Sequence, residues 1–280
     1  MFPIHENLEG KVAVITGGSG VLCSEMAREL ARQRVKVAII NRTPEKGEKI
    51  AKEIREETNG EIIAISADVL NSQALTEAKE KVMNQFGKVD ILINGAGGNH
   101  EDAITSIETH KENEAAEKSF FELTEEGFTK VFDSNFKGSF LSTKIFGEEL
   151  LKQPDSTVIN ISSMSAYAPM TKVPAYSAAK ASINNFTMWL AVYFAESGLR
   201  VNAIAPGFFL TVQNRNLLLD ENGSHTSRAE KIINGTPLNK FGEPNDLIGT
   251  LLWLVDSNYS GFVTGVTVPV DGGFMAYSGV

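Results

Sequence analysis

The sequence has very little cysteine: Cys23 is the one cysteine among 280 residues, so no internal disulfide can form. A disulfide-stabilised secreted domain is therefore not expected, and a reducing cytoplasm is the expected location. The first residues, MFPIHENLEGK, show no basic region followed by an apolar core, so we expect no secretion signal. No apolar run approaches the roughly 20 residues of a membrane-spanning helix, and we expect no membrane partner.

Positive charge is also scarce, because 26 Lys and Arg residues face 35 Asp and Glu residues, a net charge of −9. Proteins that bind nucleic acid usually carry a basic surface, so no nucleic-acid partner is expected. The histidines at positions 5, 100, 110 and 225 lack the spacing of metal ligands, and no metal is expected. These absences favour an enzyme or binding protein that acts on a small molecule.

Short apolar runs alternate with segments of helical spacing. The runs predict strands at 11–16, 35–40, 61–67, 89–94, 157–163, 199–205 and 266–270. Helices are expected over 21–33, from 44, from 72, over 127–151, over 176–196 and from 243. No Pro-rich or Ser-rich linker divides the chain. The pattern predicts one α/β domain over 1–280, a doubly wound Rossmann-type sheet of about seven parallel strands with helices on both faces.

Two segments interrupt this alternation. Residues 99–126 hold nine acidic residues and two lysines, a net charge of −7, and residues 208–233 follow the strand that ends at Ala205. Both leave carboxyl ends of predicted strands, where open α/β sheets bind ligands. We expect 208–233 to form a substrate lid. The acidic insertion 99–126 either covers the substrate or is a solvated loop, and both alternatives stay open.

A glycine-rich turn joins the first predicted strand to the first predicted helix. Glycines let the backbone approach a diphosphate, and the helix N-terminus offers free N–H groups. A P-loop would need Gly-Lys-Ser/Thr and a nucleophile elbow would need G-x-S-x-G, and this sequence has neither. The turn predicts a dinucleotide site that contains Gly17, Ser19, Gly20, Val21 and Leu22.

Ser163 ends a predicted strand, and Tyr176 and Lys180 follow four residues apart at the start of a helix, so they share a face. The pKa of a free tyrosine is about 10, too high for a base at neutral pH. A nearby ammonium and the helix N-terminus both lower that pKa. Although a surface tyrosine beside a lysine is common, the upstream Ser163 favours a site in which Tyr176 transfers a proton and Ser163 holds the substrate oxygen.

With these motifs the sequence resembles the short-chain dehydrogenase/reductases over nearly its full length. The resemblance includes Thr16–Gly20, Asp68-Val69, Asn94-Gly95-Ala96-Gly97, Asn135 in SNFKG, Pro206-Gly207 with Thr211, and VTGVTVPVDGG near the end. It implies an NAD(P)-dependent oxidoreductase that moves a hydride between nicotinamide and a secondary alcohol or ketone. It also implies a homotetramer packed through helices 176–196 and 127–151.

The resemblance implies a role for each matching residue. Asn135, Ser163, Tyr176 and Lys180 would be catalytic. Tyr176 would pass the proton, Lys180 would lower its pKa and hold the ribose, Ser163 would orient the carbonyl, and Asn135 would hold a water that links Lys180 to solvent. Further cofactor contacts would come from Asp68, Val69, Asn94, Ala96, Gly97, Pro206, Gly207 and Thr211.

The phosphate turn departs from the family pattern T-G-x-x-x-G-x-G, because Val21 and Cys23 stand where the last two glycines are usual. We expect Gly20 to provide the close backbone approach one position earlier. Cys23 is expected to pack as a small apolar side chain where the helix meets the sheet.

The choice of cofactor depends on Asn41 and Arg42, at the end of the second predicted strand. An acidic residue there would bind the ribose 2′-hydroxyl of NAD. Arg42 instead offers a forked donor to a 2′-phosphate, which favours NADP over NAD, although a solvated arginine is the alternative.

The segments VLCSEMA, GAGGNH and FFELTEEGFTKVFDSNFKG resemble a sugar-acid branch of the family, whose substrates are compounds such as D-mannonate and D-fructuronate. Asn99, His100, Gln213 and Arg215 are candidate substrate contacts on the two interrupting segments. The acidic insertion opposes an anionic substrate, so a neutral polyol or ketose is the alternative. A non-catalytic nucleotide-binding protein is a second alternative, but it would be expected to have lost Tyr176 or Lys180.

Overall fold

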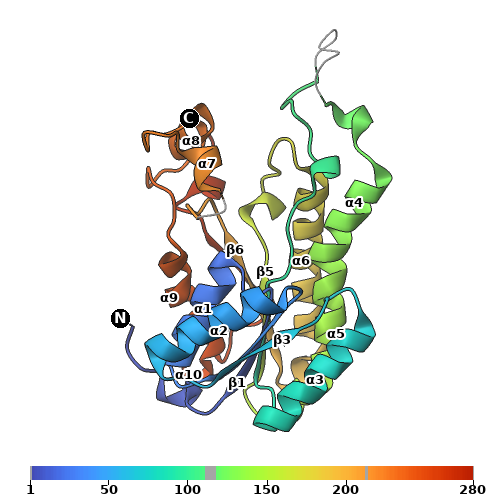
Figure 1. Cartoon of the computed structure of the whole chain (residues 1–280), viewed down its shortest axis with the longest axis vertical. Coiled ribbons are helices and arrows are strands. Elements are labelled where there is room, and N and C mark those ends of the chain that lie inside the picture. The colour runs from blue at the N-terminus through green and yellow to red at the C-terminus, as the bar shows by residue number, and fades with distance from the viewer. Residues whose placement is uncertain (1, 111–117, 212–213, 280) are drawn as a thin grey trace.

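The computed structural model describes residues 2–110, 118–211 and 214–279. Its strands form a single parallel sheet in the order β3-β2-β1-β4-β5-β6-β7 (Figure 1). The strands are β1 (Val12–Thr16), β2 (Lys36–Asn41), β3 (Ile62–Ser66), β4 (Ile91–Asn94), β5 (Thr157–Ile161), β6 (Arg200–Pro206) and β7 (Thr267–Val270). This arrangement confirms the predicted doubly wound fold.

The described helices are α1 (Val21–Arg32), α2 (Pro44–Thr58), α3 (Ser72–Phe86), α4 (Glu125–Phe132), α5 (Gly138–Leu150), α6 (Pro174–Tyr193), α7 (Arg215–Leu218), α8 (Ser227–Asn234), α9 (Ile248–Val255) and α10 (Ser257–Ser260). Side chains of α1, α2 and α9 pack on one face of the sheet, and those of α3, α5 and α6 pack on the other. Successive residues of β1 point to opposite faces, so Ala13 joins the first core and Val14 the second. Among the described helices, none has the length and apolarity to cross a membrane.

The predicted helix over 127–151 contains one irregular turn. Helix α4 ends at Phe132, a π-helical turn covers Asp133–Lys137, and α5 begins at Gly138. In this turn the Asn135 side chain donates from Nδ2 to the Val131 carbonyl oxygen at 2.8 Å, where a regular α-helix would place a backbone donor. Such turns bring an extra residue into a helix and are frequent at functional sites.

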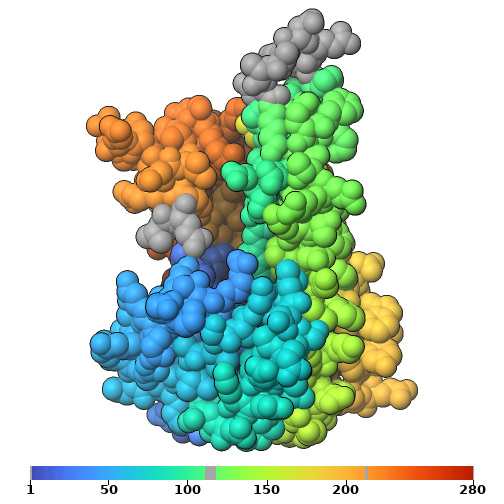
Figure 2. All heavy atoms as spheres, turned by 45° about the vertical axis from the view of Figure 1, so that its right-hand side comes forward, coloured from blue at the N-terminus to red at the C-terminus, as the bar shows by residue number. Residues whose placement is uncertain are grey.

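Two segments rise above the carboxyl ends of the strands (Figure 1). The insertion after β4 lies beside α4, and the predicted lid after β6 forms α7 and α8 on the opposite side. The lid has a small core of its own, made of Leu218, Ala229, Ile232, Ile233 and Phe241. Figure 2 shows the molecule hollowed between the lid and the column that α4 and the insertion form. This hollow is where an open α/β sheet is expected to hold its ligands.

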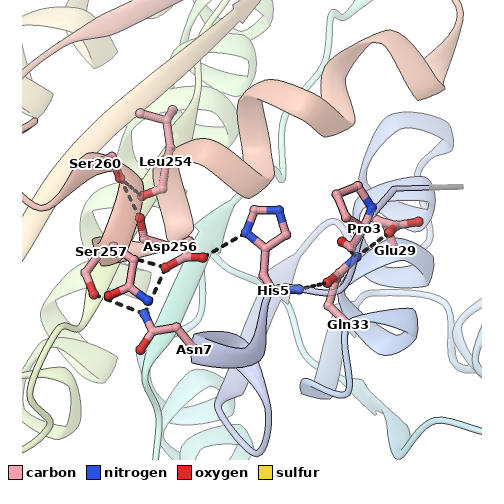
Figure 3. A network of polar contacts seen from close by, with 10 residues as sticks. Pro3, His5, Asn7, Glu29, Gln33, Leu254, Asp256, Ser257 and Ser260 are labelled. Carbon is pink, nitrogen blue, oxygen red and sulfur yellow. Dashed lines mark hydrogen bonds and ion pairs between the residues drawn. The ribbon is translucent and has the colours of Figure 1, made fainter.

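A network of polar contacts holds the N-terminal segment against the amino end of the sheet (Figure 3). His5 Nδ1 lies 2.8 Å from Asp256 Oδ2, and Asn7 Nδ2 donates to Asp256 Oδ1 at 2.9 Å. Asp256 also caps α10, because its Oδ1 accepts from the backbone N–H of Asn258. On the other side, the His5 backbone N–H donates to Gln33 Oε1 at the end of α1. The network therefore ties the N-terminal segment to both α1 and α10.

Candidate active site

A cavity of about 750 Å³ opens at the carboxyl ends of β1, β2 and β4. It is lined by the predicted cofactor residues Gly17, Ser19, Gly20, Asn41, Arg42, Asp68, Val69, Ala96 and Gly97, together with Thr43, Lys46 and Lys130. We refer to it as the nucleotide cavity. Sequence reasoning missed Lys46, although its place in the first turn of α2, four residues after Arg42, is a signal that could have found it.

The phosphate turn suits the diphosphate of a dinucleotide. Helix α1 has no side-chain cap and no acidic residue in its first turn, so its N-terminal N–H groups stay available to an anion. Gly17 has φ +66°, and a Cβ there would lie 2.8 Å from the Ala96 nitrogen and the Gly95 oxygen. The turn can approach the β4 loop this closely only because position 17 is glycine.

Cys23 is accommodated by the lack of a side chain at Gly95. Cys23 is buried in the core at the start of α1, which is the packing expected for a small apolar side chain. A Cβ at Gly95 would overlap its Sγ, so Gly95 provides the space that a glycine at position 23 would otherwise leave. Burial raises the pKa of the Cys23 thiol to about 11, so this side chain stays protonated.

A second cavity, of about 300 Å³, brings the predicted catalytic residues together. Its lining includes Asn135, Ser163, Tyr176 and Lys180, beside Val21, Leu22, Gly97, Pro206 and Gly207. It shares Gly17, Gly20 and Gly97 with the nucleotide cavity, so the two are adjacent. We refer to it as the catalytic pocket.

Lys180 and Tyr176 lie on the same side of the pocket. The Lys180 Nζ is 5.6 Å from the centroid of the Tyr176 ring and donates to the Ile161 carbonyl oxygen at 2.8 Å. Because Lys180 is only 5% exposed, desolvation lowers its pKa to about 8. The pair is therefore placed as the spacing predicted, but the ammonium is poorly solvated.

The Tyr176 pKa is raised above its ordinary value in the chain alone, whereas we predicted that it is lowered. Burial raises this pKa, and a hydrogen bond with Ser163 lowers it by less. We predicted that the Lys180 ammonium lowers the Tyr176 pKa toward neutral pH, and this prediction is wrong for the chain by itself. Desolvation of the phenolate is the larger effect, and the group that opposes it is Ser163.

Asn135 is held in the π-helical turn with one polar atom free. Its Nδ2 donates to the Gly98 carbonyl oxygen at 2.7 Å as well as to Val131. Its Oδ1 is buried and accepts no hydrogen bond from the described residues. A Cβ at Gly97 would overlap this oxygen, so the glycine lets the amide reach the pocket. A free buried acceptor in a catalytic pocket suits a residue that holds a water.

Other predicted site residues lie elsewhere. Asn94 is buried below the cavities, and its Nδ2 donates to Thr143 and Asn160. Thr211 lies outside the described cavities, and its backbone N–H donates to Asn214 Oδ1. Asn99 and His100, predicted to contact substrate, line the nucleotide cavity. Their loop leaves β4 beside the phosphate turn, which is the physical reason for this position.

Of the remaining substrate candidates, Arg215 does not line a described cavity. Arg215 is exposed on α7, and Gln213 lies outside the described residues. A third cavity, of about 550 Å³, lies beneath the lid. We call it the lid cavity; its lining includes Glu108, Lys172, Phe208, Ser227, Arg228, Lys231, Ile232 and Phe274. Sequence reasoning missed its cationic residues, which have no common motif.

The parallel sheet, the open phosphate turn and the pocket of Ser163, Tyr176 and Lys180 define an oxidoreductase that acts on alcohols and ketones with a nicotinamide dinucleotide. A family model described as short chain dehydrogenase matches residues 11–222, and the chain belongs to this family.

Similar proteins cover the whole chain. It is 66% identical to the uncharacterized oxidoreductase UxuB of Bacillus subtilis over 281 residues, with 100% of both chains covered. It is 48% identical to an uncharacterized oxidoreductase of Haemophilus influenzae, covering 99% of this chain and 97% of that protein. A crystal structure of a proposed D-mannonate oxidoreductase from Haemophilus influenza, with bound NAD, superposes with a TM-score of 0.95 at 48% identity, covering 98% of each chain.

Proposed function

We propose that this enzyme interconverts the secondary alcohol and the ketone of a sugar acid, with D-mannonate and D-fructuronate as the substrate pair. The observation that carries the chemistry is the convergence of Ser163, Tyr176 and Lys180 in one pocket beside the nucleotide cavity. The choice of a sugar acid is supported by the likeness, along 98% of both chains, to the proposed D-mannonate oxidoreductase. In this proposal the 208–233 segment is the substrate lid of a single catalytic domain.

The bound cofactor would supply the carbon centre that gives or takes the hydride. Tyr176 would give a proton to the substrate oxygen in reduction and accept it in oxidation, since its hydroxyl lines the pocket. Ser163, which hydrogen-bonds Tyr176, would hold the same substrate oxygen. The protonated Lys180 would stabilise the phenolate of Tyr176. The free Oδ1 of Asn135 would hold a water at the inner side of the pocket.

For the cofactor we propose NADP(H) over NAD(H). Arg42 and Lys46 both line the nucleotide cavity, and neither makes an ion pair with another described residue. Two cations, one just after β2 and one in the first turn of α2, suit a ribose 2′-phosphate. The relative whose structure contains NAD makes NAD(H) the competing choice. Measuring KM for both cofactors decides between them: Arg42→Ala is expected to raise KM for NADPH about tenfold and leave KM for NADH unchanged, and a wild-type preference for NADH would contradict the proposal.

We also propose a homotetramer in the cytoplasm. Helix α6 exposes a continuous apolar strip of Met188, Trp189, Val192 and Tyr193, which are 50% to 79% exposed. Such a patch is typical of a protein interface. Light scattering of the purified protein tests this proposal, and a monomer at micromolar concentration would contradict it.

The substrate proposal is tested by assaying reduction of D-fructuronate with both cofactors beside D-fructose, a neutral ketose. We expect turnover of D-fructuronate and little turnover of D-fructose. Turnover of the neutral ketose alone would favour the polyol alternative, which the acidic insertion supports. Nucleotide binding without turnover of either compound would favour the non-catalytic alternative.

A further inference from the structure

The lid cavity and the catalytic pocket share no described lining residue, but their linings are neighbours in the chain. Phe208 lines the lid cavity and directly follows Gly207 of the catalytic pocket, and the loop 168–172, which also lines it, leads to Tyr176. The rings of Phe208 and Phe274 meet edge to face, with centroids 5.1 Å apart, and form its apolar side. The lid cavity shares no lining residue with the nucleotide cavity. For the inference below, the far end of a substrate must reach from the catalytic pocket past Phe208 into this cavity.

The lid cavity is cationic. Three of its lining side chains are positively charged, Lys172, Arg228 and Lys231, and Glu108 is its single described carboxylate. Lys231 Nζ lies 3.2 Å from both carboxylate oxygens of Glu108, so these two charges neutralise each other. Lys172 and Arg228 make no side-chain hydrogen bond or ion pair within the described part of the chain. Two cations that have no partner among the described residues therefore face the same space.

The acidic insertion brings one described carboxylate, that of Glu108, to this space. Its described carboxylates other than Glu108 do not line the lid cavity. Glu122 accepts hydrogen bonds from Ser119, and Glu126 pairs with Lys130. Among the described residues, the insertion therefore adds to the cavity a single carboxylate, and Lys231 neutralises it.

The insertion also positions one of the two cations. Lys172 has φ +71°, a left-handed conformation that costs a non-glycine residue roughly 1 kcal/mol or more. Its carbonyl oxygen accepts a hydrogen bond from the Thr105 backbone N–H at 2.9 Å, so the insertion holds this conformation. Unfavourable backbone conformations of this kind are concentrated at functional sites.

We propose that Lys172 and Arg228 bind the substrate carboxylate, at the end of the molecule away from the reacting carbonyl, and select acids over neutral sugars. This inference rests on the proposed function and specifies which residues recognise the acid. A carboxylate contact remote from the reacting carbon is the same in the ground state and the transition state, so it should appear in KM more than in kcat. Arg228 offers a planar fork that can bind both carboxylate oxygens.

The test compares D-fructuronate with D-fructose in Arg228→Gln, Lys172→Gln and the double variant. Each single substitution is expected to raise KM for D-fructuronate about tenfold, the effect of one charge-assisted hydrogen bond. We expect kcat for D-fructuronate and kcat/KM for D-fructose to stay within about twofold, and the melting temperature to be unchanged. Lys52→Gln on α2, an exposed lysine outside the cavity, is the charge-matched control and should change none of these values.

A variant with the opposite sign strengthens the test. Glu108→Gln removes the one described carboxylate of the cavity and frees Lys231, so KM for D-fructuronate is expected to fall several-fold. An unchanged or higher KM in Glu108→Gln, or equal losses on D-fructuronate and D-fructose in Arg228→Gln, would overturn the proposal.

Binding of D-mannonate to the nucleotide-saturated protein, followed by calorimetry, separates this inference from the proposed function because it needs no turnover. A Kd that rises about tenfold in Arg228→Gln supports the carboxylate site even if D-fructuronate is not reduced. Wild-type turnover of D-fructuronate with KM unchanged in the double variant overturns the carboxylate site and leaves the proposed function standing. No measurable binding of D-mannonate to the wild type overturns both.

Discussion

The two ends of the sheet differ in how they treat buried polar groups. At the amino end, Asp256 is almost fully buried and accepts hydrogen bonds from His5, Asn7 and the backbone of Asn258 (Figure 3). At the carboxyl end, the buried Oδ1 of Asn135 has no partner among the described residues, and the Lys180 ammonium has one carbonyl oxygen. Groups that are satisfied by the protein stabilise it, whereas groups left open are available to a ligand and reduce stability.

Arg200 is an exception at the amino end. Its Nη1 donates to the Leu254 carbonyl oxygen and to Ser260, but its Nε and Nη2 make no hydrogen bond with the described residues. Burial lowers its pKa, and the charges of Asp155 and Asp256 oppose this effect. The amino end therefore contains both satisfied and unsatisfied buried polar groups, and the contrast holds for the Asp256 network and not for every buried group.

The largest effect is expected at the carboxyl end, from Tyr176→Phe. This change keeps the ring and removes the hydroxyl that we propose exchanges a proton with the substrate. We therefore expect turnover to fall about 10³-fold while the free energy of unfolding changes little. Steady-state kinetics and denaturant unfolding measure the two quantities. Unchanged turnover would show that Tyr176 is not the proton-transfer group.

Lys180→Met should lower turnover and raise the free energy of unfolding at pH 7. The pKa of Lys180 is about 8 in the folded chain and 10.5 ordinarily, so below pH 8 the buried ammonium destabilises the fold. The free energy of unfolding of the wild type should rise by about 3 kcal/mol between pH 8 and pH 10.5, because the unfolded chain binds the extra proton there.

In Lys180→Met this pH dependence should disappear, and stability at pH 7 should exceed that of the wild type by up to about 3 kcal/mol, less the lost hydrogen bond to Ile161. Denaturant titrations across this pH range measure the effect. Turnover should fall at the same time. A variant less stable than the wild type at pH 7 would contradict the view that the buried Lys180 ammonium destabilises the folded chain.

Asp256→Ala, at the amino end of the sheet, should lower stability and leave activity unchanged. It removes a helix cap and the acceptor of His5 and Asn7, so we expect a loss of about 2 kcal/mol in the free energy of unfolding and unchanged kcat and KM. Burial alone would raise the Asp256 pKa, but the hydrogen bonds from His5, Asn7 and Asn258 lower it on balance. Its contribution is therefore full above pH 4 and lost as the pH falls further, and an acid titration of the variant should lack this loss.

The smallest effect concerns packing at the phosphate turn. Gly95→Ala should destabilise the protein by about 1–2 kcal/mol, because the new methyl group overlaps Cys23 Sγ. Adding Cys23→Gly should recover part of this loss. Recovery should be incomplete, since the methyl group would also lie 2.9 Å from the Thr16 carbonyl oxygen. If the loss of stability in the double variant equals the sum of the losses in the two single variants, the new methyl group does not contact Cys23 directly.

The sequence by itself determined the order of strands and helices along the chain and identified Ser163, Tyr176 and Lys180 as candidate catalytic residues. Buried parallel strands read as continuous apolar runs, so alternation with helical segments identifies the fold without long-range information. The phosphate turn, Ser163, Tyr176 and Lys180 could be placed because each lies beside the end of a strand or within the first two turns of a helix. These features depend on neighbours in the chain.

Only the tertiary structure decided how distant segments meet. The π-helical turn at Asn135, the fit of Cys23 against Gly95 and the cations of the lid cavity all depend on such contacts. The Tyr176 pKa was predicted with the wrong sign for the chain alone because spacing reports which charges are near and not how much water is excluded. Periodicity describes the face that a residue occupies, whereas burial and long-range pairing arise only when the chain has packed.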